Sequence, residues 1–210
     1  MRLVIDCRMR SNSATIAWVA TAFAGTAVVA GTVLALSGAD EHGTVLALKL
    51  TARMAFLLFW PAYVAGALAL LPGAALAFPK RHARDFGLAF AAAMLVHAAL
   101  IAWLCWIDAA PASGVFLFFG PPLAFIYILA LASLPRLRQM LGHIGWRVLQ
   151  VVGMSWVAYA FATDFLGEPL HGGARYLVGY LPFAAMSIIG PVLYAVSLLP
   201  PLRRLRRASP

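Results

Sequence analysis

The chain has 210 residues, of which 63% are apolar and only 11% are charged. A soluble domain carries about a quarter charged residues, so this composition excludes a soluble domain and indicates an integral membrane protein. The formal net charge of +9 does not point to nucleic acid, because basic residues that flank apolar runs are typical of membrane proteins. No stretch between the apolar runs is long enough for a separate globular domain.

Six apolar runs are long enough to cross a membrane, which takes about 20 residues each. The links between them are short and carry the turn and charge signals. We therefore predict an all-α protein in which residues 1–210 form a single membrane domain of six helices. The predicted spans are approximately 14–37, 44–72, 87–107, 114–134, 144–165 and 177–200.

The basic residues predict the orientation of this bundle. Of the 16 lysines and arginines, 13 fall before the first span, after the sixth, in the links after the second and fourth spans, or in the first turn of the fifth span. The other side carries mostly acidic residues, with Arg175 as its basic residue. Cytoplasmic loops are enriched in basic residues, so we expect both termini to be cytoplasmic.

His97 stands alone among fifteen apolar residues in "AFAAAMLVHAALIAWL", residues 89–104. It lies about 12 residues into the third span, or ~18 Å by helical rise, which is near the middle of a bilayer core of ~30 Å. An imidazole is costly to bury there without a partner. Two interpretations are open: a hydrogen bond to a serine or tyrosine of a neighbouring helix, or axial ligation of a haem iron. Ala93, four residues earlier, would leave room for a flat cofactor.

Two further cations lie within the second span. Lys49 and Arg53 share one helical face near its outer end, where long basic side chains usually extend to the headgroups. Arg53 is the deeper of the two, and its alternative role is to pair with a haem propionate. The remaining histidines have no partners at metal-ligand spacing, so no zinc site is predicted.

The order of motifs over residues 45–165 resembles the ferric reductase-like transmembrane domain family, including the haem-binding membrane subunit of periplasmic methionine sulfoxide reductase systems. The similar pieces are "LALKLTARMAFLLFW", "RHARDFGLAFAAAMLVHAALIAWL" and "LPRLRQMLGHIGWRVLQVVGMSWVAYAF". The resemblance implies a six-helix core, haem b as cofactor and electron transfer across the membrane. It also places His97 at a haem-ligand position in the third span.

The chain departs from that pattern in the fifth span. Where the family has histidines, this sequence has Gln150 and Thr163, which are poor ligands for haem iron. Met154 lies four residues after Gln150 on the same helical face, at a depth similar to that of His97. A His97–Met154 pair is one way to hold a single haem. The alternative is that Met154 only fills space in the core.

Two functions follow from these observations. The first is a haem-b electron-transfer subunit in a bacterial inner membrane. The sequence has no nucleotide-binding segment, so electrons would come from a separate partner protein or a quinone, and any enzyme activity would be that of an oxidoreductase subunit. The second is a haem-free membrane protein with a structural, assembly or regulatory role.

Overall fold

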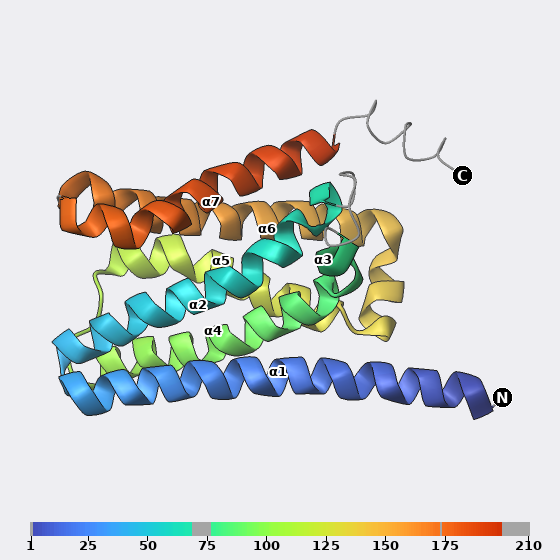
Figure 1. Ribbon diagram of the computed structural model, residues 1–210, viewed down its shortest axis with the longest axis horizontal. Coiled ribbons are helices and arrows are strands. Elements are labelled where there is room, and N and C mark those ends of the chain that lie inside the picture. The colour runs from blue at the N-terminus through green and yellow to red at the C-terminus, as the bar shows by residue number, and fades with distance from the viewer. Residues whose placement is uncertain (1, 69–76, 173, 199–210) are drawn as a thin grey trace. The chain divides into compact units, whose positions relative to one another are not determined.

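The computed structural model describes residues 2–68, 77–172 and 174–198 (Figure 1). Over these ranges, six helices are long and apolar enough to cross a membrane, so the predicted all-α membrane bundle is confirmed. The basic cluster at residues 203–207, part of the orientation argument, lies outside the described residues, and the orientation stays a prediction. The helices are α1 (Arg2–Ser37), α2 (Glu41–Leu68), α3 (Ala77–Arg81), α4 (Ala83–Trp106), α5 (Ser113–Ala132), α6 (Pro135–Gly172) and α7 (Ala174–Leu198).

The structure differs from the sequence prediction in the links on either side of the fifth span. We expected loops over residues 133–143 and 164–176, but α6 is helical from Pro135 to Gly172, and α7 begins at Ala174. The first of these links is rich in leucine, arginine, glutamine and methionine, which favour helix, and proline is well tolerated in a first helical turn. The helical path of α6 is interrupted at Gly142, which has φ 65° and ψ −179°.

The chain forms two compact units. The first contains α1, α2 as far as Phe59, and α4. Its core includes Ala30 of α1, Ala47 of α2, and Val96 and Leu100 of α4. Small side chains at such contacts let membrane helices approach closely, and this replaces the hydrophobic drive that is weak between helices in lipid.

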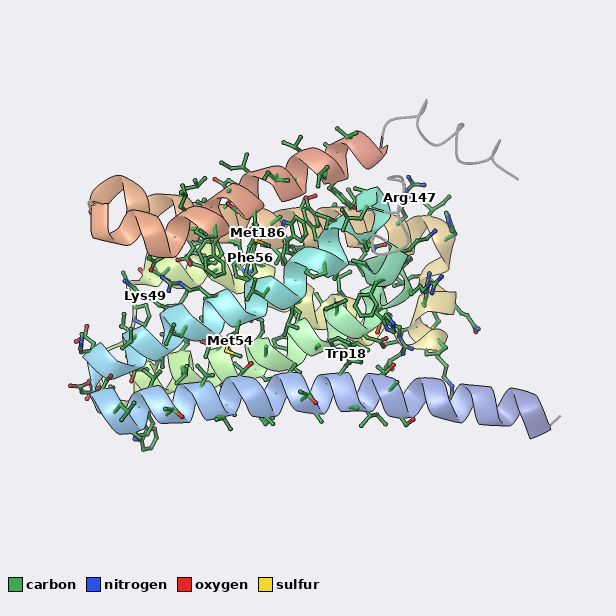
Figure 2. All side chains as sticks on the ribbon, viewed as in Figure 1. Trp18, Lys49, Met54, Phe56, Arg147 and Met186 are labelled. Atoms are coloured by element: carbon green, nitrogen blue, oxygen red, sulfur yellow. The ribbon has the colours of Figure 1, made fainter. Side chains whose placement is uncertain are left out.

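Polar contacts fix α4 at both ends in this unit. At its start, the Thr15 hydroxyl donates to an Asp85 carboxylate oxygen at 2.6 Å, and the Trp18 and Phe86 rings lie 5.0 Å apart. Figure 2 shows Trp18 on the side of α1 that faces α4. Near the other end, the indole N–H of Trp103 donates to the Ala39 carbonyl at 2.9 Å. These contacts place α4 parallel to α1 and hold its register, and thereby the height of His97.

The second unit contains the rest of α2 with α3, α5, α6 and α7. Gly153 of α6 lies against Leu129 and Phe125 of α5. Farther along α6, Phe165 packs on Tyr180 and Phe183 of α7.

The end of α2 packs on α7 within the second unit. The Trp60 indole N–H donates to the Met186 carbonyl at 2.9 Å, and the Tyr63 and Tyr194 rings stack at 4.6 Å. Figure 2 labels Met186 on α7.

Candidate functional site

His97 hydrogen-bonds to a hydroxyl of a neighbouring helix within the first unit. The Oγ1 atom of Thr51, on α2, lies 3.0 Å from Nδ1 of His97, on α4. Thr51 is fully buried, and its hydroxyl also donates to the Leu48 carbonyl of its own helix at 3.1 Å. The imidazole therefore has the hydroxyl partner that one interpretation of the sequence required, although the residue is a threonine rather than a serine or tyrosine.

These two contacts favour one protonation pattern of the imidazole. A hydroxyl has one proton to donate and can accept through its oxygen. If Thr51 donates to the Leu48 carbonyl, then Nδ1–H of His97 donates to Thr51, and Nε2 is the unprotonated nitrogen. Metal-ligating histidines are commonly held in this way, with one ring N–H given to a protein acceptor and the other nitrogen left to bind. Within the described residues, Nε2 makes no hydrogen bond.

The surroundings of His97 are closely packed on one side. Ala93, Val96 and Leu100 are buried, whereas His97 itself is half-buried. Ala93 is fully buried, so its small side chain serves close packing and does not leave the open room expected from the sequence.

Arg53 and Lys49 leave α2 on a different side from Thr51. Residues two apart on a helix point about 200° apart, so neither cation shares the face on which Thr51 meets His97. Figure 2 shows Lys49 toward the end of α2 where the helix begins. Both side chains are half-buried and both take part in interactions, and the Nε atom of Arg53 is buried. The role of Arg53 as a propionate partner stays a prediction.

The candidate residues of the fifth span lie on α6, in the second unit. Gln150 is exposed and Met154 is half-buried. The Thr163 hydroxyl donates to the Ala160 carbonyl of its own helix at 2.8 Å, so this position is occupied by a local hydrogen bond. His97 belongs to the first unit and Met154 to the second, and their pairing as axial ligands stays a prediction.

Thr51 is the site residue that sequence reasoning did not single out. The signal was present, since Thr51 is an uncharged polar residue in the apolar run "LALKLTARMAFLLFW". Threonine is common in membrane helices because its hydroxyl can bond to its own backbone. Nothing in the pattern distinguishes Thr51 from Thr44, whose hydroxyl donates only to the Asp40 carbonyl near the start of the same helix.

Over the ranges described, no group of three or more histidine, cysteine, aspartate or glutamate side chains is arranged to hold a metal ion. The fold and the site together define an integral membrane protein of the helical-bundle class with a polar contact inside its first unit. Comparison with protein-family models, with curated proteins and with solved structures found no match.

Proposed function

We propose that this chain is a membrane-embedded haem-b electron-transfer subunit in which Nε2 of His97 would hold the haem iron. One observation carries the proposal: the Thr51 hydroxyl lies 3.0 Å from Nδ1 of a half-buried imidazole in an apolar helix. The bond fits the donor chemistry of a metal-ligating histidine, because it orients the ring and leaves the second nitrogen to bind.

The roles of the chain's own residues follow from this arrangement. Thr51 would hold the tautomer and ring angle of His97 by accepting a hydrogen bond from its Nδ1–H, while the packed residues at Ala93, Val96 and Leu100 would exclude water from that side. Met154, with Gln150 beside it, would be a second residue that holds the haem, and Arg53 would pair with a propionate. When bound, haem would supply one-electron redox chemistry.

The setting of the proposal is a bacterial inner membrane. Electrons would arrive from a separate partner protein or a quinone, because no nucleotide-binding motif occurs in this sequence. In that setting the chain would act as an oxidoreductase subunit whose own contribution is to hold and orient the cofactor.

A second candidate function is a haem-free membrane protein with a structural, assembly or regulatory role. The same hydrogen bond supports it, because a single hydroxyl partner already satisfies one nitrogen of His97. The local hydrogen bond of Thr163 and the exposure of Gln150 support it as well, since neither position presents a strong iron ligand. In this role the Thr51–His97 contact would join α2 to α4.

Absorption spectra of the full chain, purified from cells supplied with haem, separate the two functions. The first predicts a Soret band and reducible α and β bands, which His97→Ala abolishes and His143→Ala retains. His143 is the matched control because it is an exposed histidine on α6. His97→Gln keeps a group able to hydrogen-bond to Thr51. A folded, colourless His97→Gln protein would therefore show that haem is lost because the iron ligand is missing, not because the protein misfolds. A colourless wild-type protein, or an unchanged spectrum in His97→Ala, would overturn the haem proposal.

The same preparation tests the second ligand. If Met154 binds the iron, Met154→Ala changes the low-spin spectrum while the Soret band persists, because His97 still holds the haem. An unaltered spectrum in Met154→Ala assigns this residue to packing alone.

A further inference from the structure

The start of α6 is set off from the rest of the helix by a bend. Residues Pro135–Leu141 are helical, Gly142 has φ 65° and ψ −179°, and the helix then continues to Gly172. This backbone conformation is essentially restricted to glycine. Figure 1 shows the ribbon changing direction at the beginning of α6. We call residues 135–147 the elbow.

The helix α6 is longer than one membrane crossing requires. The stretch of α6 that qualifies as a candidate span covers 33 residues, Pro135–Gly167, or ~50 Å of helix, whereas a bilayer core is ~30 Å thick. The part after Gly142 has about the length needed for a span. The first two turns of α6 are therefore not needed to cross the bilayer. The bend at Gly142 lets them run at an angle to the membrane-spanning part.

The short helix is amphipathic at the spacing of an α-helix. Leu137 and Leu141 are four residues apart on one face of this helix, and Leu134, just before it, continues the same spacing. Arg136 and Arg138 fall on either flank of that face, and all five side chains are exposed. The three leucines are 39–47% exposed.

The apolar surface and the positive charge continue past the bend. Met140 is 83% exposed and Ile144 is 78% exposed, and Arg147 is exposed as well. Figure 2 shows Arg147 projecting from α6 beyond the bend. The Arg138 guanidinium lies 5.1 Å from the centre of the Trp146 ring, and this cation–π contact joins the two sides of the elbow. No acidic residue occurs between Ser133 and Thr163 in the sequence.

We infer that the elbow is an interfacial segment that binds anionic phospholipid headgroups. Arg136, Arg138 and Arg147 would contact the lipid phosphates, while the exposed Met140 and Ile144 enter the upper part of the acyl chains. An apolar face flanked by arginines, with an adjacent tryptophan, is the pattern of helices that lie in the membrane surface. Charge complementarity selects anionic over zwitterionic lipid, since each basic residue near such a surface strengthens binding. This inference does not depend on whether haem is bound.

Lipid retention by the full chain tests the charge part of the inference. The protein is reconstituted in phosphatidylcholine mixed with phosphatidylglycerol, extracted in mild detergent and analysed for retained lipid by native mass spectrometry. The triple variant Arg136→Gln/Arg138→Gln/Arg147→Gln should lose retained phosphatidylglycerol, by about fivefold in affinity for each arginine. The control, Lys80→Gln/Arg81→Gln/Arg84→Gln, removes the same charge from exposed positions elsewhere and should retain it.

Two outcomes of this measurement would overturn the inference. Equal loss in both triple variants would show general electrostatic attraction rather than a site at the elbow. Displacement of the lipid by inorganic phosphate alone would show a free-phosphate site rather than a lipid site.

Spin labels test the depth of the elbow separately. Gln139 and Met140 point about 100° apart on the short helix, with Gln139 turned away from the apolar face and Met140 at its edge. Each is replaced by cysteine in a chain whose two native cysteines are changed to serine. In lipid vesicles the Met140→Cys label should be accessible to oxygen, and the Gln139→Cys label to a water-soluble nickel complex. Water accessibility of both labels, or burial of both in a contact between two copies of the chain, would contradict membrane insertion.

Discussion

Replacing Thr51 by valine removes one hydroxyl and keeps the shape of the side chain. The substitution deletes the contact at 3.0 Å to Nδ1 of His97 and the one at 3.1 Å to the Leu48 carbonyl. Hydrogen bonds between helices in a membrane contribute about 0.6 kcal/mol on average and up to about 1.7 kcal/mol. A buried polar atom left without a partner costs about 1–3 kcal/mol, a figure that already includes the lost hydrogen bond. We therefore expect Thr51→Val to lower the free energy of unfolding by about 1–3 kcal/mol.

The measurement is thermal unfolding of the full chain in one detergent, with Thr44→Val as the matched control. Thr44 lies on the same helix and is also fully buried, but its hydroxyl donates to the Asp40 carbonyl of its own helix at 2.7 Å. At about 2–4 °C for each kcal/mol in a chain of this length, the Tm of Thr51→Val should fall by several degrees. Thr44→Val should change little.

A double-mutant cycle tests the Thr51–His97 pair itself. Once His97 is replaced by leucine, Thr51→Val should cost much less than it does in the wild-type chain, because the partner atom is already gone. Equal losses for Thr51→Val in both backgrounds would refute the coupling. So would equal losses for Thr51→Val and Thr44→Val, since the interhelical contact would then contribute nothing beyond the local one.

Two glycine substitutions, also measured by thermal unfolding, test other features of the second unit. Gly142→Ala should cost about 1–3 kcal/mol because alanine is strained at φ 65° and ψ −179°, whereas Gly145→Ala, whose Cβ would meet Leu141 only at ordinary contact distance, should not. A neutral Gly142→Ala would contradict the bend. Gly190→Ala would place a Cβ 3.1 Å from the Trp60 indole nitrogen and should cost about 1–3 kcal/mol by overpacking. Its control, Gly66→Ala, has no atom within 4 Å and should be neutral or stabilising; equal effects would refute the tight fit.

The number and type of the helices could be predicted because they depend on local composition. A membrane requires about 20 apolar residues for each helix, and every backbone group must find its partner within the helix. The positions of the six candidate spans therefore follow from hydropathy alone, and the structure confirms the six-helix class. Hydropathy does not determine where a helix ends when apolar residues are mixed with polar residues that also favour helix. The continuation of α6 over residues 135–143 is the result of that mixture.

The contact at His97 was predictable only in part. An unpaired imidazole at membrane depth is costly, so a partner for His97 was predictable, and a hydroxyl of a neighbouring helix was one of the two partners expected. The identity of Thr51 depends on how α2 and α4 are placed side by side. That register is set by contacts far away in the sequence, such as Thr15 with Asp85 and Trp103 with the Ala39 carbonyl. No local pattern distinguishes a threonine that joins two helices from one that bonds only to its own backbone.

The hydrogen bond between Thr51 and His97 supports both candidate functions, so the decisive atom is the other nitrogen of the ring. A contact whose only task is to join α2 to α4 needs one hydrogen-bonding group, and glutamine at position 97 would supply it. A haem ligand needs a second nitrogen with a free electron pair, which an amide does not provide. His97→Gln therefore separates stability from ligation within one variant. A structural contact predicts that stability is largely kept, and a haem site predicts that the spectrum disappears even where the fold persists.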